Sequence, residues 1–303
     1  MTTTTGRVPA IVYHPAKVED LDTWQDDLAR ICSEEGWSEP MWLPTTPQDH
    51  GSGVAAKALE EGADLVCALG GDGTVRNVAT SLAGTGTPLG VLGMGTGNLL
   101  ARNLDLPFNE LEESLRTALT GRDRTIDIGW ISFDGKDEEC FLVIAGMGID
   151  AQTMSDVDDD LKSSIGWLAY LVSGAKALVR PGFSARIGLD GHRATSAHHH
   201  RTVLVCNCGT LQGGVDLVPD ASIDDGLLDT LTMSPRSVVG WAAVAAHVIT
   251  RQRRGHRLLD HRTCQRCSIE VPHAMEAEVD GDAVGTVHRL EARVDPGALV
   301  VRV

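Results

Sequence analysis

The sequence has few aromatic residues and no long apolar run. Phenylalanine, tryptophan and tyrosine make up only 4% of its 303 residues. The longest apolar stretches, residues 166–178 and 237–249, are interrupted by serine, glycine, lysine or histidine. Both fall short of the roughly 20 apolar residues that a membrane-spanning helix needs. The chain begins with Met1 and four threonines, which do not resemble a signal peptide. We therefore expect no transmembrane segment.

Regularly spaced cysteines are also missing. The seven cysteines form an odd set, and 42% of the residues are hydrophobic. A small disulfide scaffold or a disordered chain would have a different composition. We expect a globular protein of the reducing cytoplasm that is large enough for two domains.

Positive charge is scarce. Lysine and arginine number 26 against 42 acidic residues, which gives a net charge of −16 and a pI near 5.0. Such a surface disfavours a general attraction to nucleic acid or to anionic lipid head groups. We expect no nucleic-acid partner, and any anion-binding site must be local.

The first 120 residues alternate between strand-like and helical patterns. We predict strands at residues 9–13, 39–43, 64–69 and 88–92, with helices at 21–35, 53–61, 75–83 and from Asn98. This order predicts an α/β domain whose parallel sheet is covered on both faces. Ligands of such sheets lie beyond the carboxyl ends of the strands.

From about residue 126 the pattern changes to many short strand-like runs. They lie at residues 126–132, 140–145, 185–189, 201–207, 227–233, 268–271 and 289–294. These runs predict a mostly antiparallel β-sandwich or barrel, with helices near 161–179 and 238–252. We therefore predict an α/β domain at 1–126 and a β-rich domain at 127–295, with residues 296–303 packing back onto the first domain.

The common phosphate-binding motifs are absent. There is no G-x-x-x-x-G-K-[ST], no G-x-G-x-x-G with an acidic partner about 20 residues on, and no H-R-D with D-F-G. Glycine-rich loops at residues 70–74 (GGDGT) and 93–98 (GMGTGN) instead connect predicted strands to predicted helices. Glycine lets backbone N–H groups turn toward a bound anion. The alternative is that these glycines only satisfy tight turns, but two such loops on neighbouring strands favour a phosphate cradle.

The polar residues of the two loops have expected roles. Asp72 could organise a metal ion or its water shell, and Thr74 could cap the following helix. Thr96 and Asn98 are polar groups at the start of the next helix.

Residues 68–75 (ALGGDGTV) and 88–98 (PLGVLGMGTGN) resemble the catalytic domain of the diacylglycerol kinase family. This family includes soluble bacterial lipid kinases and sphingosine kinases, and NAD kinases are more distant relatives that share Gly-Gly-Asp-Gly. The resemblance continues in the family's order through residues 145–151 (AGMGIDA), 213–214 with 218–221, 225–229 (DGLLD) and 280–282 (DGD). It covers nearly the whole chain.

The resemblance implies an ATP site. Carried over position by position, its residues are Thr45, Gly70, Gly71, Asp72, Gly73, Thr74, Val75, Arg76, Thr96 and Asn98. Thr46 matches the family position as well as Thr45 does. His14-Pro15 stands where the family has Asn-Pro, and Asn98-Leu99 stands where it has Asn-Asp.

A kinase that acts on an alcohol needs a carboxylate to accept the hydroxyl proton. Asp282 matches the acidic position of the family's Asp-Gly-Glu motif, and the resemblance implies that it is this catalytic base. The alternative is a plain hairpin turn, which most Asp-Gly pairs form. Asp72 is the rival base, because NAD kinases are thought to use the corresponding aspartate.

The resemblance also implies a structural Mg²⁺ site. Asp225 would supply a carboxylate, and Ser222 and Leu227 would supply backbone carbonyls, which are oxygen ligands that suit Mg²⁺. The alternative is an acidic turn. A single C-x-x-C, Cys264 to Cys267, is better explained by buried thiols than by zinc.

Two segments indicate where a lipid would bind. Residues 161–179 are rich in apolar side chains, and residues 238–249 run into a stretch, 251–266, that has six arginines and one acidic residue, Asp260. Apolar helices beside basic residues can lie at a bilayer surface. The alternative is that both helices cover the sheet.

Together these observations predict a cytoplasmic lipid kinase, peripheral at the inner membrane face, that transfers the γ-phosphoryl group of ATP, with Mg²⁺, to a lipid hydroxyl. Diacylglycerol is the expected acceptor. We expect ATP and the acceptor to bind in a cleft between the two domains. A soluble-metabolite kinase such as an NAD kinase and a non-catalytic nucleotide- or lipid-binding regulator are the alternatives. The sequence leaves open whether the chain forms a homodimer.

Overall fold

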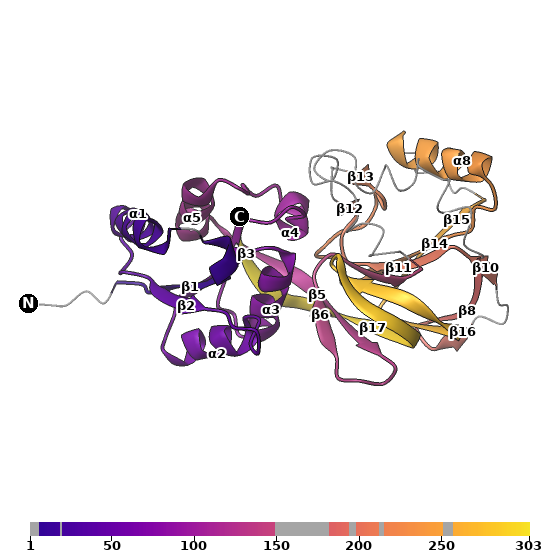
Figure 1. Ribbon diagram of the computed structural model, residues 1–303, viewed down its shortest axis with the longest axis horizontal. Coiled ribbons are helices and arrows are strands. Elements are labelled where there is room, and N and C mark those ends of the chain that lie inside the picture. The colour runs from indigo at the N-terminus through magenta and orange to yellow at the C-terminus, as the bar shows by residue number, and fades with distance from the viewer. Residues whose placement is uncertain (1–5, 19, 149–181, 194–197, 212–214, 251–256) are drawn as a thin grey trace, which may run out of the picture. The chain divides into compact units, whose positions relative to one another are not determined.

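The chain forms a parallel α/β unit followed by a largely antiparallel β unit (Figure 1), which confirms the predicted fold class. The computed structural model describes residues 6–18, 20–148, 182–193, 198–211, 215–250 and 257–303. The first unit is Met1–Ile126 with Gly297–Val303, and the second is Asp127–Pro296.

The first unit alternates strands and helices along the chain. Its elements are β1 (Pro9–Tyr13), a 3-10 turn (Pro15–Lys17), α1 (Leu21–Glu34), β2 (Met41–Pro44), α2 (Ser52–Glu60), β3 (Leu65–Gly70), α3 (Asp72–Leu82), β4 (Leu89–Gly93), α4 (Leu99–Asn103) and α5 (Leu111–Thr120). Strand β5 (Asp123–Phe133) then leads into the second unit.

The sheet of the first unit is parallel. Its order is β4, β3, β1, β2, and the end of β17 (Asp282–Arg302) adds a parallel pairing between Val301 and Leu89. The helices α1 and α5 lie over one face, and α2 and α3 lie over the other (Figure 1). Strands β1 and β3 are buried along their whole length, which is the pattern of a sheet covered on both sides.

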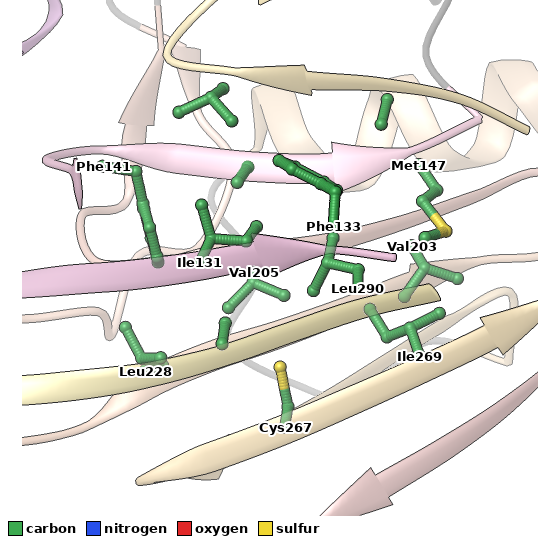
Figure 2. Close-up of a cluster of buried hydrophobic side chains, with 14 of the residues drawn as sticks. Ile131, Phe133, Phe141, Met147, Val203, Val205, Leu228, Cys267, Ile269 and Leu290 are labelled. Carbon is green, nitrogen blue, oxygen red and sulfur yellow. The ribbon is translucent and has the colours of Figure 1, made fainter. Parts of the chain in front are cut away.

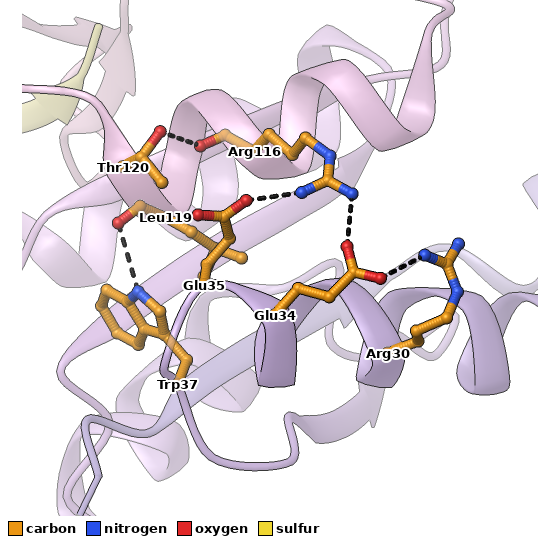
Figure 3. A network of polar contacts seen from close by, with 7 residues as sticks. All are labelled: Arg30, Glu34, Glu35, Trp37, Arg116, Leu119 and Thr120. Carbon is orange, nitrogen blue, oxygen red and sulfur yellow. Dashed lines mark hydrogen bonds and ion pairs between the residues drawn. The ribbon is translucent and has the colours of Figure 1, made fainter.

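Helix α1 shows how the local sequence sets one of these layers. The Asp20 carboxylate accepts the Thr23 N–H at 3.3 Å and caps the helix, and Leu28, Ile31 and Cys32 form its buried stripe. At its other end, Arg116 on α5 pairs with Glu34 at 2.6 Å and with Glu35 at 2.5 Å (Figure 3). These charges are partly exposed, so burial of the apolar stripe contributes more to stability than the ion pairs do.

The second unit is built mainly from strands. After β5 its elements are β6 (Glu139–Phe141), β7 (Ile144–Met147), β8 (Phe183–Leu189), β9 (His192–Arg193), β10 (His198–His200), β11 (Thr202–Cys206), β12 (Thr210–Leu211), β13 (Val215–Asp216), β14 (Leu228–Met233), α8 (Val238–Ile249), β15 (Leu259–Cys264), β16 (Arg266–Val279) and β17. Strands β12 and β13 form a separate two-stranded sheet.

Antiparallel pairing dominates this unit. The order is β15, β14, β11, β7, β16, β17, with β8 also paired to β16 and β5 also paired to β17. Alternate residues of these strands point into one hydrophobic cluster, drawn in Figure 2, where Phe141, Val203, Ile269 and Leu290 are among the buried side chains. This alternation is the period of two that a strand with one face on a core requires.

Helix α8 packs onto the second unit through Trp241, Val244 and Val248, all of which are buried. Ser237 caps its first turn by accepting the Gly240 N–H at 3.2 Å. Val239 lies on the opposite side and is 78% exposed. In the described part of the chain, no helix combines the length and the hydrophobicity needed to cross a bilayer.

Two sequence predictions of local structure are wrong in detail. Helix α3 begins at Asp72, not at Val75, and its N-cap is Gly71 without a side-chain cap, so Thr74 is not the capping residue. The run predicted at residues 140–145 is two strands, β6 and β7, because the N–H groups of Leu142 and Val143 bind the Asp280 carboxylate instead of a neighbouring strand. Strand β15 lies inside the arginine-rich stretch and was not predicted.

Gly129 provides a test of the core packing. It pairs with Phe141 between β5 and β6, and a β-carbon at Gly129 would overlap the Phe141 ring. We expect Gly129→Ala to lower the free energy of unfolding by about 1–3 kcal/mol, measured by chemical denaturation, because the buried ring has no room to move.

The control is the same substitution in a Phe141→Leu background. The smaller leucine leaves space for the new methyl group, so Gly129→Ala should cost less there than in the wild-type background. Equal costs in the two backgrounds would contradict this account of the contact.

Candidate functional site

The two glycine loops meet at the carboxyl ends of β3 and β4. Gly70 and Gly93 are paired in the sheet, and the Met94 N–H donates to the Gly70 carbonyl at 2.8 Å. A β-carbon on Gly95 would lie 2.9 Å from the Gly71 Cα. Because a side chain at position 95 would clash with the first loop, glycine at this position is what lets the two loops touch.

Asp72 joins the loops from the first turn of α3. Its Oδ1 accepts the N–H of Leu99, the first residue of α4, at 2.5 Å. A β-carbon on Gly97 would collide with the Asp72 carboxylate. The Asp72 side chain therefore spans the second loop and holds the start of α4 against the start of α3.

Asn98 shapes the second loop from within. Its backbone is left-handed at φ +47°, a conformation that asparagine tolerates better than most residues do. Its Oδ1 accepts the Gly95 N–H at 3.0 Å, and its Nδ2 donates to the Gly95 carbonyl at 2.7 Å. The side chain is buried, so it folds the loop.

The first turn of α3 places backbone donors beside these loops. The first N–H groups of an α-helix have no partner inside the helix and carry its positive dipole end, which suits an anion. At α3 these groups belong to Asp72, Gly73 and Thr74. Thr74 packs back over Gly70, and Val75 is buried.

Arg76 and Thr96 lie at the surface of this region. Arg76 is half-buried in the first half of α3, and Thr96 is exposed at the tip of the second loop. Both side chains belong to the same end of the parallel sheet as the two glycine loops.

The loops after β1 and β2 reach the same end of the sheet. Thr45 is buried, and its N–H donates to the Tyr13 carbonyl at 2.9 Å. Thr46 is exposed, and its hydroxyl oxygen accepts the Asp49 N–H at 3.0 Å. His14 caps the 3-10 turn by accepting the Ala16 N–H at Nδ1. Thr45 and the glycine loops thus lie at the same end of the parallel sheet, with β1 between β2 and β3.

In the second unit, Asp280 is the buried anchor of the turn between β16 and β17. Its carboxylate accepts the N–H groups of Leu142, Val143 and Ile144 at 2.9, 2.9 and 3.0 Å. Its own N–H donates to the Ile144 carbonyl at 2.7 Å. Sequence reasoning identified Asp280 only as part of a motif, and its anchoring role had no local signal.

Asp282 is the first residue of β17 and lies directly after this turn. Asp280 and Gly281 have φ values of +48° and +88°, and Val279 pairs with Asp282. Such a two-residue turn favours Asp-Gly. The Asp282 side chain is exposed to solvent. The other aspartate of the same turn, Asp280, is held in place by its hydrogen bonds.

The loop before β14 carries Ser222, Asp225 and Leu227. Asp225 accepts the Leu227 N–H at 3.0 Å, and the Ser222 hydroxyl donates to Asp224 at 2.7 Å. Burial, together with the charges of Asp229, Asp127 and Asp224, raises the pKa of Asp225 above its ordinary value. A bound cation would offset the electrostatic repulsion between Asp225 and these neighbouring carboxylates.

A chain of buried and partly buried hydrogen bonds connects this loop to the residues that Asp280 anchors. Asp127 accepts the Gly226 N–H at 2.7 Å, and its carbonyl accepts from Asn207 Nδ2 at 3.1 Å. The same Nδ2 donates to the Leu142 carbonyl at 3.0 Å. Asp127 and Asn207 were not predicted from the sequence, because neither lies in a motif with a readable chemical role.

Glu278 is a further buried carboxyl that the sequence did not reveal. It is 4% exposed and lies on β16, opposite Gly146 on β7. Burial raises the pKa of Glu278 from 4.5 to about 7, and the nearby charges of Asp280 and Asp282 act in the same direction. This carboxyl is therefore largely neutral below pH 7.

Several predicted features lie outside the described residues. They are the helix at 161–179, residues 149–151 of the motif at 145–151, Gly213 and Gly214, and the arginines at 251, 253 and 254. Of the remaining arginine-rich stretch, Arg262 lies on β15 and pairs with Asp260 at 3.0 Å, so part of that positive charge is neutralised.

Profiles of two known domains match consecutive parts of the chain. The diacylglycerol kinase catalytic domain matches residues 11–131, and the YegS C-terminal NAD kinase beta sandwich-like domain matches residues 143–303. A diacylglycerol kinase of Bacillus subtilis (strain 168) is 27% identical over 281 residues, which cover 91% of this chain and 89% of that protein.

Solved structures share the fold. The crystal structure of a diacylglycerol kinase from Bacillus anthracis superposes with a TM-score of 0.70 and 21% identity, covering 99% of this chain and 97% of the other. An NAD kinase from Archaeoglobus fulgidus in complex with ATP superposes with a TM-score of 0.51 and 12% identity, covering 98% of this chain and 93% of the other.

Because the Asp280 carboxylate accepts three hydrogen bonds, we expect that replacing it with a neutral side chain strongly destabilises the folded protein. Asp280→Asn should lower the free energy of unfolding by about 2–4 kcal/mol, because an amide cannot accept all three N–H groups and turns a donor toward them. Asp282→Asn, at the exposed position two residues on, should cost less than about 1 kcal/mol. Chemical denaturation of both variants tests this, and equal costs would contradict the anchoring role.

Glu278 predicts a pH dependence of stability. Its pKa rises from 4.5 in the unfolded chain to about 7 on folding, so the folded state binds the proton more tightly. The contribution of the protonated carboxyl to the free energy of unfolding is therefore fully present below pH 4.5 and is lost as the pH rises to 7. Glu278→Gln should remove this loss, so that the variant gains up to about 3 kcal/mol relative to wild type between pH 4.5 and 7.5. Unfolding measured across this range checks the gain, and a constant difference between the two proteins would refute it.

Proposed function

Because the chain belongs to the family that unites diacylglycerol kinases and YegS-like lipid kinases, we propose that it transfers the γ-phosphoryl group of ATP to the hydroxyl of a lipid, with diacylglycerol as the acceptor. The observation that carries the proposal is the contact of two glycine loops at the amino end of α3. Gly95 approaches the Gly71 backbone so closely there that a β-carbon at position 95 would lie 2.9 Å from the Gly71 Cα.

In this proposal the glycine loops bind the phosphates of ATP. The N–H groups of Gly73 and Thr74 belong to the first turn of α3, where backbone donors and the helix dipole favour an anion. Residues 70, 71, 95 and 97 are glycines and have no side chain, so phosphate oxygens can approach their backbone closely. Thr45, Val75, Arg76, Thr96 and Asn98 complete the proposed set, with Asp72 and Asn98 shaping the loops.

The chemical step needs a base for the lipid hydroxyl. We assign this role to Asp282, whose exposed carboxylate accepts the proton while the hydroxyl oxygen forms a bond to the γ-phosphorus and the bond to ADP breaks. Asp280 holds the turn that carries it. Asp72 is less suited to this role, because its carboxylate accepts the Leu99 N–H at the start of α4.

The Asp225 loop fits a structural Mg²⁺. The carboxylate of Asp225 and the backbone carbonyls of Ser222 and Leu227 are hard oxygen donors, and the raised pKa of Asp225 reflects the surrounding negative charge that a divalent cation would balance. In the nucleotide site, a bound Mg²⁺ would neutralise phosphate charge during transfer. The loop itself contains Ser222, Asp225 and Leu227. Hydrogen bonds hold it in place, because Asp127 connects it to Asn207.

The proposal is tested by incubating the purified chain with Mg²⁺, γ-labelled ATP and a total lipid extract, and identifying the labelled product by mass spectrometry. We expect phosphorylated diacylglycerol in the wild-type reaction. Asp282→Asn should reduce turnover by about 10²–10⁴ while ATP affinity in calorimetry stays near normal, because only the proton acceptor is removed.

The control variant is Glu291→Gln, which neutralises another exposed carboxylate on β17, one that pairs with Arg289 at the surface. It should keep full turnover. Label on NAD and on no lipid would refute the lipid-kinase proposal, and ATP binding without any transfer would favour a regulator. Loss of turnover in Asp72→Asn with full turnover in Asp282→Asn would reassign the base.

Contact with a membrane surface and formation of a homodimer remain predictions. The described residues contribute the exposed Val239 on α8 and the exposed Arg257 and Arg266 to the proposed membrane-facing region. Lipid bilayers with anionic head groups attract such basic residues over about 10 Å at 0.1 M salt.

A further inference from the structure

Strand β15 forms an open edge of the second unit. It pairs with β14 from Leu259 to Cys264, and among the described strands none pairs with its other edge. Residues 260–263 are all exposed, whereas the two strands next to β15 in the sheet, β14 and β11, are buried along their whole length. Backbone N–H and C=O groups along β15 are therefore available to a further strand.

The exposed side chains of this edge carry charges of opposite sign. Asp260 and Arg262 are two residues apart and so lie on the same face of the sheet, with side chains that are 59% and 64% exposed. Native edge strands are commonly protected by charges that repel a second strand. One acid and one base on the same face do not repel an antiparallel copy of the strand, because each can lie opposite its counterpart.

Symmetry restricts how a second copy can add to this edge. Two copies related by a two-fold axis pair so that residue i contacts residue j and residue j contacts residue i. Residues opposite each other in an antiparallel pair also lie on the same face. Centring the pair on Asp260 or on Arg262 places two like charges opposite each other. Centring it on His261 instead places Asp260 of each copy opposite Arg262 of the other.

The middle of β15 is already fixed in the single chain. His261 Nε2 lies 2.5 Å from Asp229 Oδ1, and Asp229 is buried on the neighbouring strand β14. The cross-strand pairing to β14 is continuous over the whole of β15. A second copy would therefore meet a preformed edge, which lowers the entropy cost of association.

We propose that β15 is the interface of a homodimer, in which two copies of the chain join their sheets antiparallel about His261. The second copy is the partner that this edge fits, because its own charges complement those of the first. The same charges select the register, since a shift to either neighbouring charged residue would oppose like charges. None of these residues belongs to the proposed ATP site or the proposed Mg²⁺ loop, so the inference does not depend on the proposed function.

Analytical ultracentrifugation of the full-length chain tests the interface. We expect the wild type to sediment with twice the chain mass of 32.3 kDa. Arg262→Asp should weaken the dimer at least about tenfold, because Asp260 then lies opposite another acid. Adding Asp260→Arg to this variant exchanges the two charges and should restore the dimer. The matched control, Arg289→Asp, reverses an exposed arginine that pairs with Glu291 on β17, and should leave the dimer intact.

Introduced cysteines test the register. All seven native cysteines are buried, so they give little background. In a mixture of chains with Asp260→Cys and chains with Arg262→Cys, the two new thiols should lie opposite each other, at a separation that a disulfide can span. Mild oxidation should link the mixture into dimers on a non-reducing gel. Either variant alone should remain largely unlinked.

Two results would overturn the proposal. One is a wild-type chain that has the mass of a single copy at every concentration measured. The other is a dimer that persists in Arg262→Asp and gives no cross-link in the cysteine mixture, because that dimer would use another surface. Circular dichroism shows whether each variant is folded, and the cysteine mixture keeps the test decisive if Arg262→Asp alters the fold.

Discussion

The carboxylate of Asp280 is the interaction on which the candidate site of the second unit depends. It accepts three consecutive backbone N–H groups, from Leu142 to Ile144, inside the protein. Hydrogen bonds to a charged acceptor are stronger than neutral ones, and leaving such a group unpaired in the interior is costly. This one side chain therefore ends β6, starts β7 and holds the turn from which Asp282 projects.

The same device recurs at two other hairpins. Asp134 accepts the N–H groups of His288 and Arg289, and Asp190 accepts those of Gln265 and Arg266. Asp134, Asp190 and Asp280 all adopt a left-handed backbone and are followed by glycine. Three Asp-Gly turns are thus alike in local geometry, and a further acidic residue after the turn, at 282, is what makes one of them a candidate for chemistry.

The first unit uses an aspartate for a comparable purpose. Asp72 accepts the Leu99 N–H and holds the start of α4 beside the start of α3. The contact between Gly71 and Gly95 requires glycine at position 95, because a β-carbon there would lie 2.9 Å from the Gly71 Cα. In both the glycine loops and the Asp280 turn, a carboxylate therefore fixes the backbone beside residues that we propose to act on ATP or on the lipid hydroxyl.

The sequence by itself determined the fold class, the types of most elements and the candidate loops, because strands such as β1 and β3 and the stripe of α1 reveal their burial in their own residues. It also placed Asp282 in a turn. Only the tertiary structure decided which acids are anchors, since Asp280 binds N–H groups up to 138 residues away in the sequence. The burial of Glu278 likewise depends on which strands become neighbours, and no local pattern encodes the environment that raises its pKa.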